Sequence, residues 1–192
     1  AAGGIPIFRF VHVHGDNVIK MRQTVSMSLA YGVKAFKWWV GWTMFDIHKV
    51  VETEPPPLSD IGREVGRCNN TMAAFSPSLV GARSVAVYHT APLPASTREA
   101  PGDYWVRPSG EHIVMGVFEG ARGERFIALG NRDIGEPRMA DVTVEGRVRK
   151  VRRMDKGSRQ WKDIPVREEG GVSKVSLEIA KGDIELLEVV RE

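Results

Sequence analysis

Apolar and polar positions repeat in two different ways along the chain, and the change between them divides it into two parts. Up to about residue 83 the pattern runs strand, helix, strand, helix. Apolar residues follow a β-type pattern in the strand segments and recur at three- and four-residue steps in the helical segments. From Ser84 onward, short runs of β-branched and aromatic residues recur between Gly, Pro, Asn and Asp. We therefore predict an α/β part over residues 1–83 and an all-β part over residues 84–192.

The strongest hydrophobic signal of the first part is the segment Val33 to Asp46, VKAFKWWVGWTMFD, which is rich in Trp and Phe. Successive side chains of a strand point to opposite faces, which divides the segment into two sets: Phe36, Trp38, Val40 and Trp42, against Ala35, Lys37, Trp39 and Gly41. Both sets are mainly apolar. This pattern predicts a strand of a parallel sheet that is covered on both faces.

A second β pattern and a helical pattern precede this segment. Residues Ile5 to His14 are rich in β-branched and aromatic types, and Gly15 and Asp16 end the run. Asn17 is a suitable N-cap for a helix, whose apolar face is formed by Val18, Met21, Val25 and Leu29. Because the joints are short, we predict that strand, helix and strand form a right-handed parallel crossover.

The clearest periodicity of the chain lies between Leu58 and Phe75. Its apolar residues step by three and four positions, as on one face of a helix: Leu58, Ile61, Val65, Cys68, Met72 and Phe75. Ser59 is a suitable N-cap for this helix, and the proline run before it predicts a surface loop. We expect Ser76-Pro77 to end the helix.

The second part contains six β runs, at 85–90, 113–119, 125–131, 140–151, 172–179 and 184–190. A long Pro-rich loop joins the first two runs. The last two are predicted to form a hairpin that turns at Lys181-Gly182-Asp183. This pattern predicts an antiparallel β-sandwich. Its Trp105 and Trp161 are candidates either for packing or for an aromatic binding surface.

Composition and charge narrow the classes of function. With 192 residues, a formal net charge of +3 and a single Cys, the chain has the composition of an ordinary globular protein and no intramolecular disulfide. Cys68 falls on the apolar helix face, which predicts a buried, inert thiol. The sequence contains no apolar run of about 18 residues, so it predicts no membrane span. The basic run Arg147–Lys162 alternates with Val, which indicates the solvated face of a strand rather than a nucleic-acid groove.

The beginning of the chain adds one expectation. The sequence starts without Met, and its first apolar strand begins at Ile5. A strand this apolar needs neighbours on both sides. We therefore expect the C-terminal part of a longer polypeptide, or one chain of a split protein.

Two short motifs give the sequence a family resemblance. The segment Trp42-Thr43-Met44-Phe45-Asp46 is similar to the W-(S/T)-x-x-D pattern that ends the eighth barrel strand of many retaining glycosidases. The closing GDIELLEVV is similar to the G-D-x-x-L-x-x-(V/L) strand of their terminal sandwiches. The chain thus resembles the C-terminal end of a (β/α)8-barrel glycoside hydrolase, namely the final β-α-β-α segment of the barrel followed by a β-sandwich.

The resemblance implies a substrate site at the carboxyl ends of the last two barrel strands. Trp42 would form the floor of the subsite that holds the cleaved sugar, and polar side chains nearby would bind its hydroxyls. The implied substrate-binding residues are His12, His14, Asp16, Trp39, Trp42 and Asp46.

The catalytic residues remain open at this point. Glycoside hydrolysis needs two carboxyl groups. The resemblance makes Ile5 to His14 the seventh barrel strand, and no Glu stands at its end. The main carboxylates would therefore come from residues not present here, or Asp16 would take such a role instead of capping the following helix. His12 and His14 share a strand face, which would suit a metal pair, but no third ligand lies nearby.

The resemblance also implies the partners. We expect a carbohydrate substrate and the remainder of the barrel, as an N-terminal part or a second chain, and no cofactor, metal, nucleic acid or membrane. Homo-oligomerisation is left open, and a secreted or periplasmic location is favoured over the cytoplasm. The alternatives are a non-catalytic carbohydrate-binding or interaction module and a metal-dependent barrel hydrolase.

Overall fold

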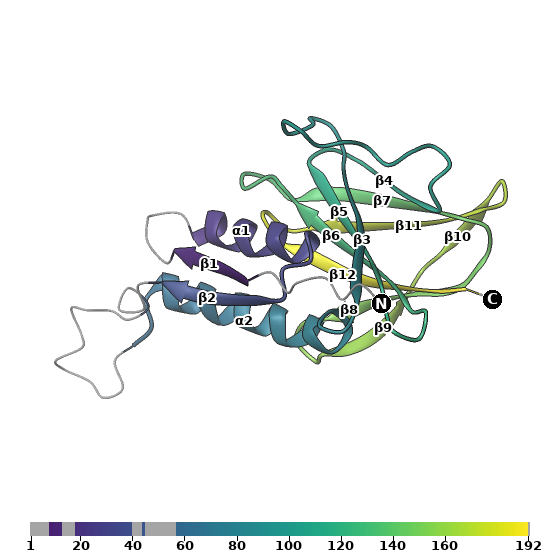
Figure 1. Cartoon of the computed structure of the whole chain (residues 1–192). Helices are drawn as coiled ribbons and strands as arrows, with labels where there is room; N and C mark the ends of the chain where they lie inside the picture. The colour runs from purple at the N-terminus through teal and green to yellow at the C-terminus, as the bar shows by residue number, and fades with distance from the viewer. Residues whose placement is uncertain (1–7, 13–17, 40–43, 45–56, 192) are drawn as a thin grey trace.

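The computed structural model describes residues 8–12, 18–39, 44 and 57–191. These residues form a mainly β structure with two α-helices. The helices and a pair of parallel strands lie together on one side of an antiparallel sandwich (Figure 1). The predicted order of strand, helix, strand and helix followed by a run of strands is confirmed for this part of the chain.

The first unit is β1 (Phe8–His12), α1 (Val18–Ala30) and β2 (Ala35–Trp39). The two strands pair in parallel, with Phe8 beside Ala35 and His12 beside Trp39. Helix α1 ends in a turn at Gly32, whose φ of 84° lies in the left-handed region that favours glycine. The predicted crossover unit is therefore present. The outer residues of both predicted strands lie outside the described residues.

Helix α2 (Asp60–Leu79) follows, and Ser59 caps it as predicted, because the Gly62 N–H donates to the Ser59 hydroxyl at 3.1 Å. The prediction that Ser76-Pro77 would end this helix is wrong, since Pro77 lies inside its last turn. Proline fixes φ near the helical value, so close to the C-terminus it removes one backbone hydrogen bond without breaking the helix. The buried Leu79 extends the apolar face by one more turn.

The remaining strands form two antiparallel sheets. One sheet has the order β10-β11-β7-β4 and the other the order β3-β5-β6-β12-β8-β9. Their bounds are β3 Arg83–His89, β4 Val106–Ser109, β5 Ile113–Glu119, β6 Arg125–Asn131, β7 Arg138–Glu145, β8 Val148–Asp155, β9 Gln160–Ile164, β10 Arg167–Glu169, β11 Val172–Ile179 and β12 Ile184–Arg191. The predicted sandwich is present, with more strands than the sequence pattern indicated.

Three differences in strand content have local causes. The run predicted as one strand over residues 140–151 is two strands, because Gly146 with a φ of 79° turns the chain between β7 and β8. Strand β4 lies in the segment predicted as loop and contains Pro108, which weakens the β signal. Strands β9 and β10 are short and polar, so alternation does not reveal them.

The predicted terminal hairpin is wrong in its pairing. The chain turns at Lys181-Gly182-Asp183, but β11 pairs with β7 and β10, whereas β12 pairs with β6 and β8. The turn therefore carries the chain from one sheet to the other. A turn motif specifies a change of direction, while the partner of each strand is decided by which faces must be buried.

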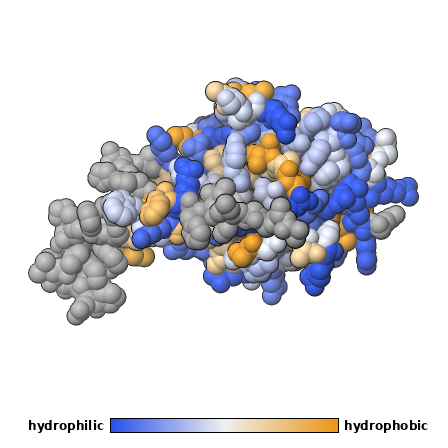
Figure 2. All heavy atoms as spheres, viewed as in Figure 1, coloured by the Kyte–Doolittle hydropathy of each residue, from blue (hydrophilic) through white to orange (hydrophobic). Residues whose placement is uncertain are grey.

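Two hydrophobic cores hold the structure together. The inter-sheet core fills the sandwich and includes Ile113, Ile127 and Leu187, while the helix-side core packs α1 and α2 on the outer face of the six-stranded sheet through residues such as Phe75 and Phe118. Hydrophobic residues on the face seen in Figure 2 form small patches among hydrophilic ones. Because the helix-side core is shared by both predicted parts, the division at residues 83 and 84 stays a prediction.

Candidate functional site

The parallel pair β1–β2 has two unlike faces. On one face, Val11 is 2% exposed and packs with Phe36 and Trp38 into the helix-side core. The indole N–H of Trp38 donates to Asn69 Oδ1 of α2 at 2.9 Å, which satisfies the one polar group of that side chain. This face of the strand pair is therefore a packing surface.

The opposite face carries an exposed aromatic group, which we name the aromatic platform and define as Phe10, Lys37 and Trp39. Phe10 is 63% and Trp39 53% exposed. Their rings meet edge to face with centroids 6.4 Å apart, and Lys37 Nζ lies 5.6 Å from the Phe10 centroid. An exposed indole can stack on the apolar C–H face of a sugar, and an ammonium group can donate to its hydroxyls.

The predicted site residues fall into two groups. Trp39 is described, and the β register places His12 beside it at the carboxyl end of the strand pair. The other four predicted residues, His14, Asp16, Trp42 and Asp46, lie outside the described residues. Of the six predicted site residues, the structure therefore places His12 and Trp39 next to each other on paired strands.

Two members of the aromatic platform were missed by the sequence reasoning. Phe10 pairs with Lys37 in the register of the two strands, and Lys37 lies two positions before Trp39, so these three residues share one face. Strand alternation could have indicated both. The apolar pattern predicted instead that both strands are covered on each face. In the described residues they are covered on one.

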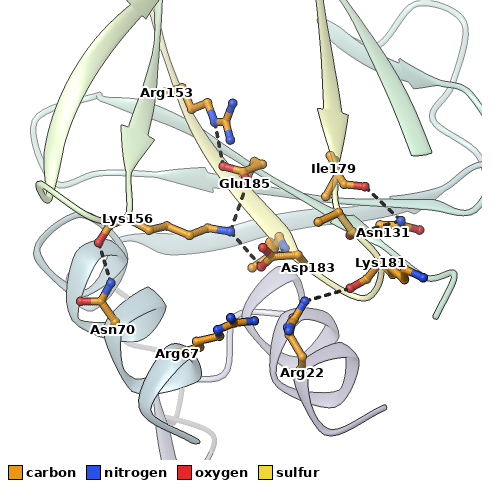
Figure 3. A network of polar contacts seen from close by, with 12 residues as sticks. Arg22, Arg67, Asn70, Asn131, Arg153, Lys156, Ile179, Lys181, Asp183 and Glu185 are labelled. Carbon is orange, nitrogen blue, oxygen red and sulfur yellow. Dashed lines mark hydrogen bonds and ion pairs between the residues drawn. The ribbon is translucent and has the colours of Figure 1, made fainter. Parts of the chain in front are cut away.

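A network of ion pairs lies where the helices meet the sandwich (Figure 3). Arg22 of α1 donates through two nitrogens to the Glu64 carboxylate of α2, at 2.6 and 2.7 Å. Lys156 Nζ lies 2.8 Å from Asp183 and 3.1 Å from Glu185. These pairs join α1 to α2 and the end of β8 to the start of β12.

The same network lines a cavity of about 360 Å³, to which Cys68 contributes. Burial raises the pKa of the Cys68 thiol to about 12, and the nearby Glu64 carboxylate adds to this effect. The thiol is therefore protonated at neutral pH and unsuited to nucleophilic attack. Because Arg22 and Lys156 are already paired with carboxylates, the network serves as a joint between the layers.

His89 of β3 forms a second polar contact between the helices and the sandwich. Its Nε2 lies 2.8 Å from the hydroxyl of Tyr31, which follows α1. Its Nδ1 and the Nε of Arg132 are buried without a hydrogen-bond partner among the described residues. Burial, with a further contribution from the Arg132 charge, lowers the pKa of His89 to about 4. The imidazole is therefore neutral at pH 7.

The two tryptophans of the sandwich differ. The guanidinium carbons of Arg125 and Arg191 lie 4.8 and 5.1 Å from the ring centroid of Trp105, so side chains of the same chain occupy this ring. Trp161 stacks on Phe126 with centroids 6.0 Å apart, and it also lines a surface cavity. Trp105 is thus a packing residue, whereas Trp161 forms part of the wall of this cavity.

Among the described residues, no group of three or more His, Cys, Asp or Glu side chains could hold a metal ion. Neither of the two described helices is long and apolar enough to cross a membrane. In the basic run Arg147–Lys162, three cations, Arg152, Arg153 and Lys156, pair with carboxylates at 183–188.

Comparison with known proteins gives matches only among solved structures. No family model matches the chain, and no curated protein matches it. A GH30 endoxylanase from Clostridium papyrosolvens is similar at 11% identity and a TM-score of 0.46, over 96% of this chain and 42% of that chain. The catalytic domain of GH30 xylanase C from Talaromyces cellulolyticus is similar at 14% identity and a TM-score of 0.44, over 98% of this chain and 39% of that one.

A GH27 β-L-arabinopyranosidase from Geobacillus stearothermophilus is similar at 9% identity and a TM-score of 0.42, over 91% of this chain and 30% of that chain. All three are glycoside hydrolases, at low sequence identity. The chain spans less than half the length of each of them.

Proposed function

We propose that the chain is the C-terminal part of a (β/α)8-barrel glycoside hydrolase that acts on a polysaccharide or oligosaccharide. It contributes walls of the substrate subsite and a supporting β-sandwich. The observation that carries the proposal is the parallel β1–β2 pair, with helices packed on one face and the aromatic platform exposed on the other.

Parallel sheets occur almost only with both faces covered. In the described residues, β1 and β2 pair only with each other, and one face carries Phe10 and Trp39 without cover. The remainder of a barrel would supply both missing strand neighbours and would enclose this face. The motifs at Trp42–Asp46 and 182–190 support the same family.

Within such a barrel, the carboxyl ends of the strands form the active-site face. His12 and Trp39 lie at that end of the pair, and His14, Asp16, Trp42 and Asp46 follow directly in the chain. These six residues are the proposed substrate-binding set. Hydrolysis requires two carboxyl groups at a fixed separation, and we assign the main pair to the remainder of the barrel.

The test is to isolate the protein in native form, with any polypeptide that co-purifies, and to measure release of reducing ends from a panel of polysaccharides. We expect activity, and we expect Trp39→Ala to lower kcat/KM by about tenfold or more, which corresponds to about 1.4 kcal/mol of lost transition-state binding. Met139→Ala is the matched control, since Met139 is an equally exposed apolar residue on the sandwich.

The proposal is contradicted if no polysaccharide is cleaved, or if Trp39→Ala and Met139→Ala have the same activity as the unmodified protein. A uniform loss of activity and of melting temperature in Trp39→Ala would assign that side chain to packing.

A second candidate function is a non-catalytic carbohydrate-binding module. The observation that favours it is the cavity beside Trp161, which opens between the end of α2 and the sandwich and shares no lining residue with the aromatic platform. Retention of the 192-residue chain on insoluble polysaccharides, without cleavage by the native form, would support this alternative over the hydrolase.

A further inference from the structure

The end of α2 leaves part of the six-stranded sheet uncovered. The helix packs along β8 and stops at Leu79 (Figure 1). Beyond this point a cavity of about 360 Å³ opens between the last turn of the helix, the β5–β6 turn and the sheet. Its walls include Gly81, Glu124, Arg152, Trp161 and Glu188.

Cross-strand pairing explains why these side chains meet. Phe126, Glu188 and Arg152 are direct neighbours on β6, β12 and β8, so they point to the same face of the sheet. Met154 lies two positions after Arg152 and pairs with Trp161 of β9, which places the indole on that face as well. Sequence positions that span more than sixty residues thus form one surface.

Trp161 supplies an aromatic wall to the cavity. Its ring is nearly parallel to that of Phe126, with 13° between the planes, and the contact fixes its orientation without burying it fully. The guanidinium carbon of Arg152 lies over the indole, 5.6 Å from its centroid, and Arg152 also lines the cavity. A preoriented indole beside charged hydrogen-bonding groups is suited to a ligand with one apolar face and a polar rim.

The polar groups of the cavity retain unused hydrogen-bonding capacity. Arg152 Nε donates to Glu188 Oε2 at 2.6 Å, and its Nη2 contacts the same oxygen. Glu188 Oε1 has no hydrogen-bond partner among the described residues, although the side chain is only 11% exposed. A carboxylate oxygen accepts from hydroxyl groups, and the remaining guanidinium N–H groups donate to them.

The charges that line the cavity balance. Arg152 pairs with Glu188, and at the rim Arg122 pairs with Glu124 at 2.8 Å. An anionic ligand would meet two carboxylates, and a cationic ligand would meet two guanidinium groups. A neutral ligand with several hydroxyls is repelled by neither kind of group, because each hydroxyl can donate a hydrogen bond to a carboxylate and accept one from a guanidinium group.

We propose that this cavity binds a neutral saccharide unit of a polysaccharide. The apolar C–H face of the sugar lies on Trp161, and its hydroxyls donate to Glu188 Oε1 and accept from Arg152. The cavity volume falls at the lower end of the roughly 300–1,000 Å³ range of small-molecule sites. The site is independent of the proposed hydrolase function, because none of its residues belongs to the aromatic platform.

The test uses the 192-residue chain and its tryptophan indole N–H signals in nuclear magnetic resonance spectra. Xylotetraose, cellotetraose, mannotetraose and maltotetraose are the neutral probes, and trigalacturonate is the acidic probe. We expect at least one neutral probe to shift the Trp161 signal in a saturable way, and trigalacturonate to leave it unchanged.

Two variants locate the binding. Trp161→Ala, which lacks the reporting indole and is therefore followed by isothermal titration calorimetry with the same probe, is expected to abolish it. Gly81→Leu is expected to weaken it at least tenfold by filling the space, and a Cβ at Gly81 meets no atom within 4 Å, so this variant should fold normally. Trp39→Ala is the control on the aromatic platform and should bind the probe as the unmodified chain does.

The inference is overturned if no neutral probe shifts the Trp161 signal, or if trigalacturonate alone does so. It is also overturned if Gly81→Leu binds as well as the unmodified chain. Loss of polysaccharide hydrolysis in Trp39→Ala with unchanged binding here would separate this site from the proposed active site.

Discussion

Strands β2 and β12 have similar hydrophobic patterns and different surroundings. In β12, every residue from Ile184 to Val189 is buried, because β6 and β8 pair with its two edges and a hydrophobic core lies on each face. In β2, no residue is fully buried, and within the described residues only β1 pairs with it. An apolar pattern on both faces of a strand predicts that both faces are buried. It does not indicate which segments bury them.

The difference assigns different roles to the two regions. The sandwich buries its apolar residues between its two sheets and beneath the two helices, so these apolar residues are structural. The parallel unit satisfies one face through the helices and leaves Phe10 and Trp39 to solvent. Exposed aromatic residues on an ordered strand pair are typical of binding surfaces. The predictions below test this contrast.

The largest effect is expected at β12. Leu187→Ala removes a fully buried side chain from the inter-sheet core, and we expect it to lower the free energy of unfolding by about 2–5 kcal/mol. Urea unfolding followed by circular dichroism measures this loss. A loss of less than about 1 kcal/mol would show that the sandwich core is not what holds β12 in place.

The next effect concerns the joint between the helices. In Arg22→Met, the Glu64 carboxylate, whose side chain is 5% exposed, loses its bidentate partner. We expect a loss of about 2–3 kcal/mol, because the nearby Arg67 replaces only part of the interaction. The double variant Arg22→Met with Glu64→Leu should be more stable than the single one, since no unpaired buried charge remains. If the double variant were less stable than Arg22→Met, the assignment of Arg22 and Glu64 as a buried ion pair would be wrong.

The two faces of β2 allow a matched comparison of adjacent tryptophans. Trp38→Ala should destabilise the chain by about 1–3 kcal/mol, less than for a fully buried Trp, because Trp38 packs only partly into the helix-side core. Trp39→Ala should change stability by no more than about 0.5 kcal/mol. Both values come from the same urea titrations. Equal losses at the two positions would remove the distinction between the packed and the exposed face.

The smallest effect is a pH dependence at His89. The folded chain binds this proton more weakly than the unfolded chain, because the pKa of His89 is lowered from 6.5 to about 4. The stabilising contribution of the neutral imidazole is therefore complete above about pH 6.5 and decreases as the pH falls toward about 4. Over this interval the free energy of unfolding should fall in both proteins. We expect the fall in His89→Gln to be smaller than in the unmodified chain, by on the order of 1–2 kcal/mol. Parallel pH profiles of the two proteins would contradict the assignment.

Much of the fold could be predicted where the signal is local. The apolar steps from Leu58 to Phe75 predicted α2, and the short joints around α1 predicted the parallel crossover. Non-local decisions could not be read in this way. The turn at Lys181-Gly182-Asp183 does not specify that β11 and β12 belong to different sheets, and Pro77 is tolerated because its helix is nearly complete.

The candidate site shows the same limit. Trp39 could be predicted because aromatic residues gather at the end of one strand. Strand alternation assigns Phe10 and Lys37 to faces of their own strands, but their meeting with Trp39 required the register of β1 on β2, and the cavity beside Trp161 required three cross-strand pairs. Sites built from neighbouring strands depend on register, which composition and periodicity do not specify.

The mass of the native protein tests the central claim most directly. If the parallel unit belongs to a barrel, native mass spectrometry of the protein from its source should show a species larger than this 21.3 kDa chain. The additional polypeptide should be joined to the chain or tightly bound to it. A stable 21.3 kDa species that hydrolyses a polysaccharide by itself, with Trp39 exposed, would contradict the account.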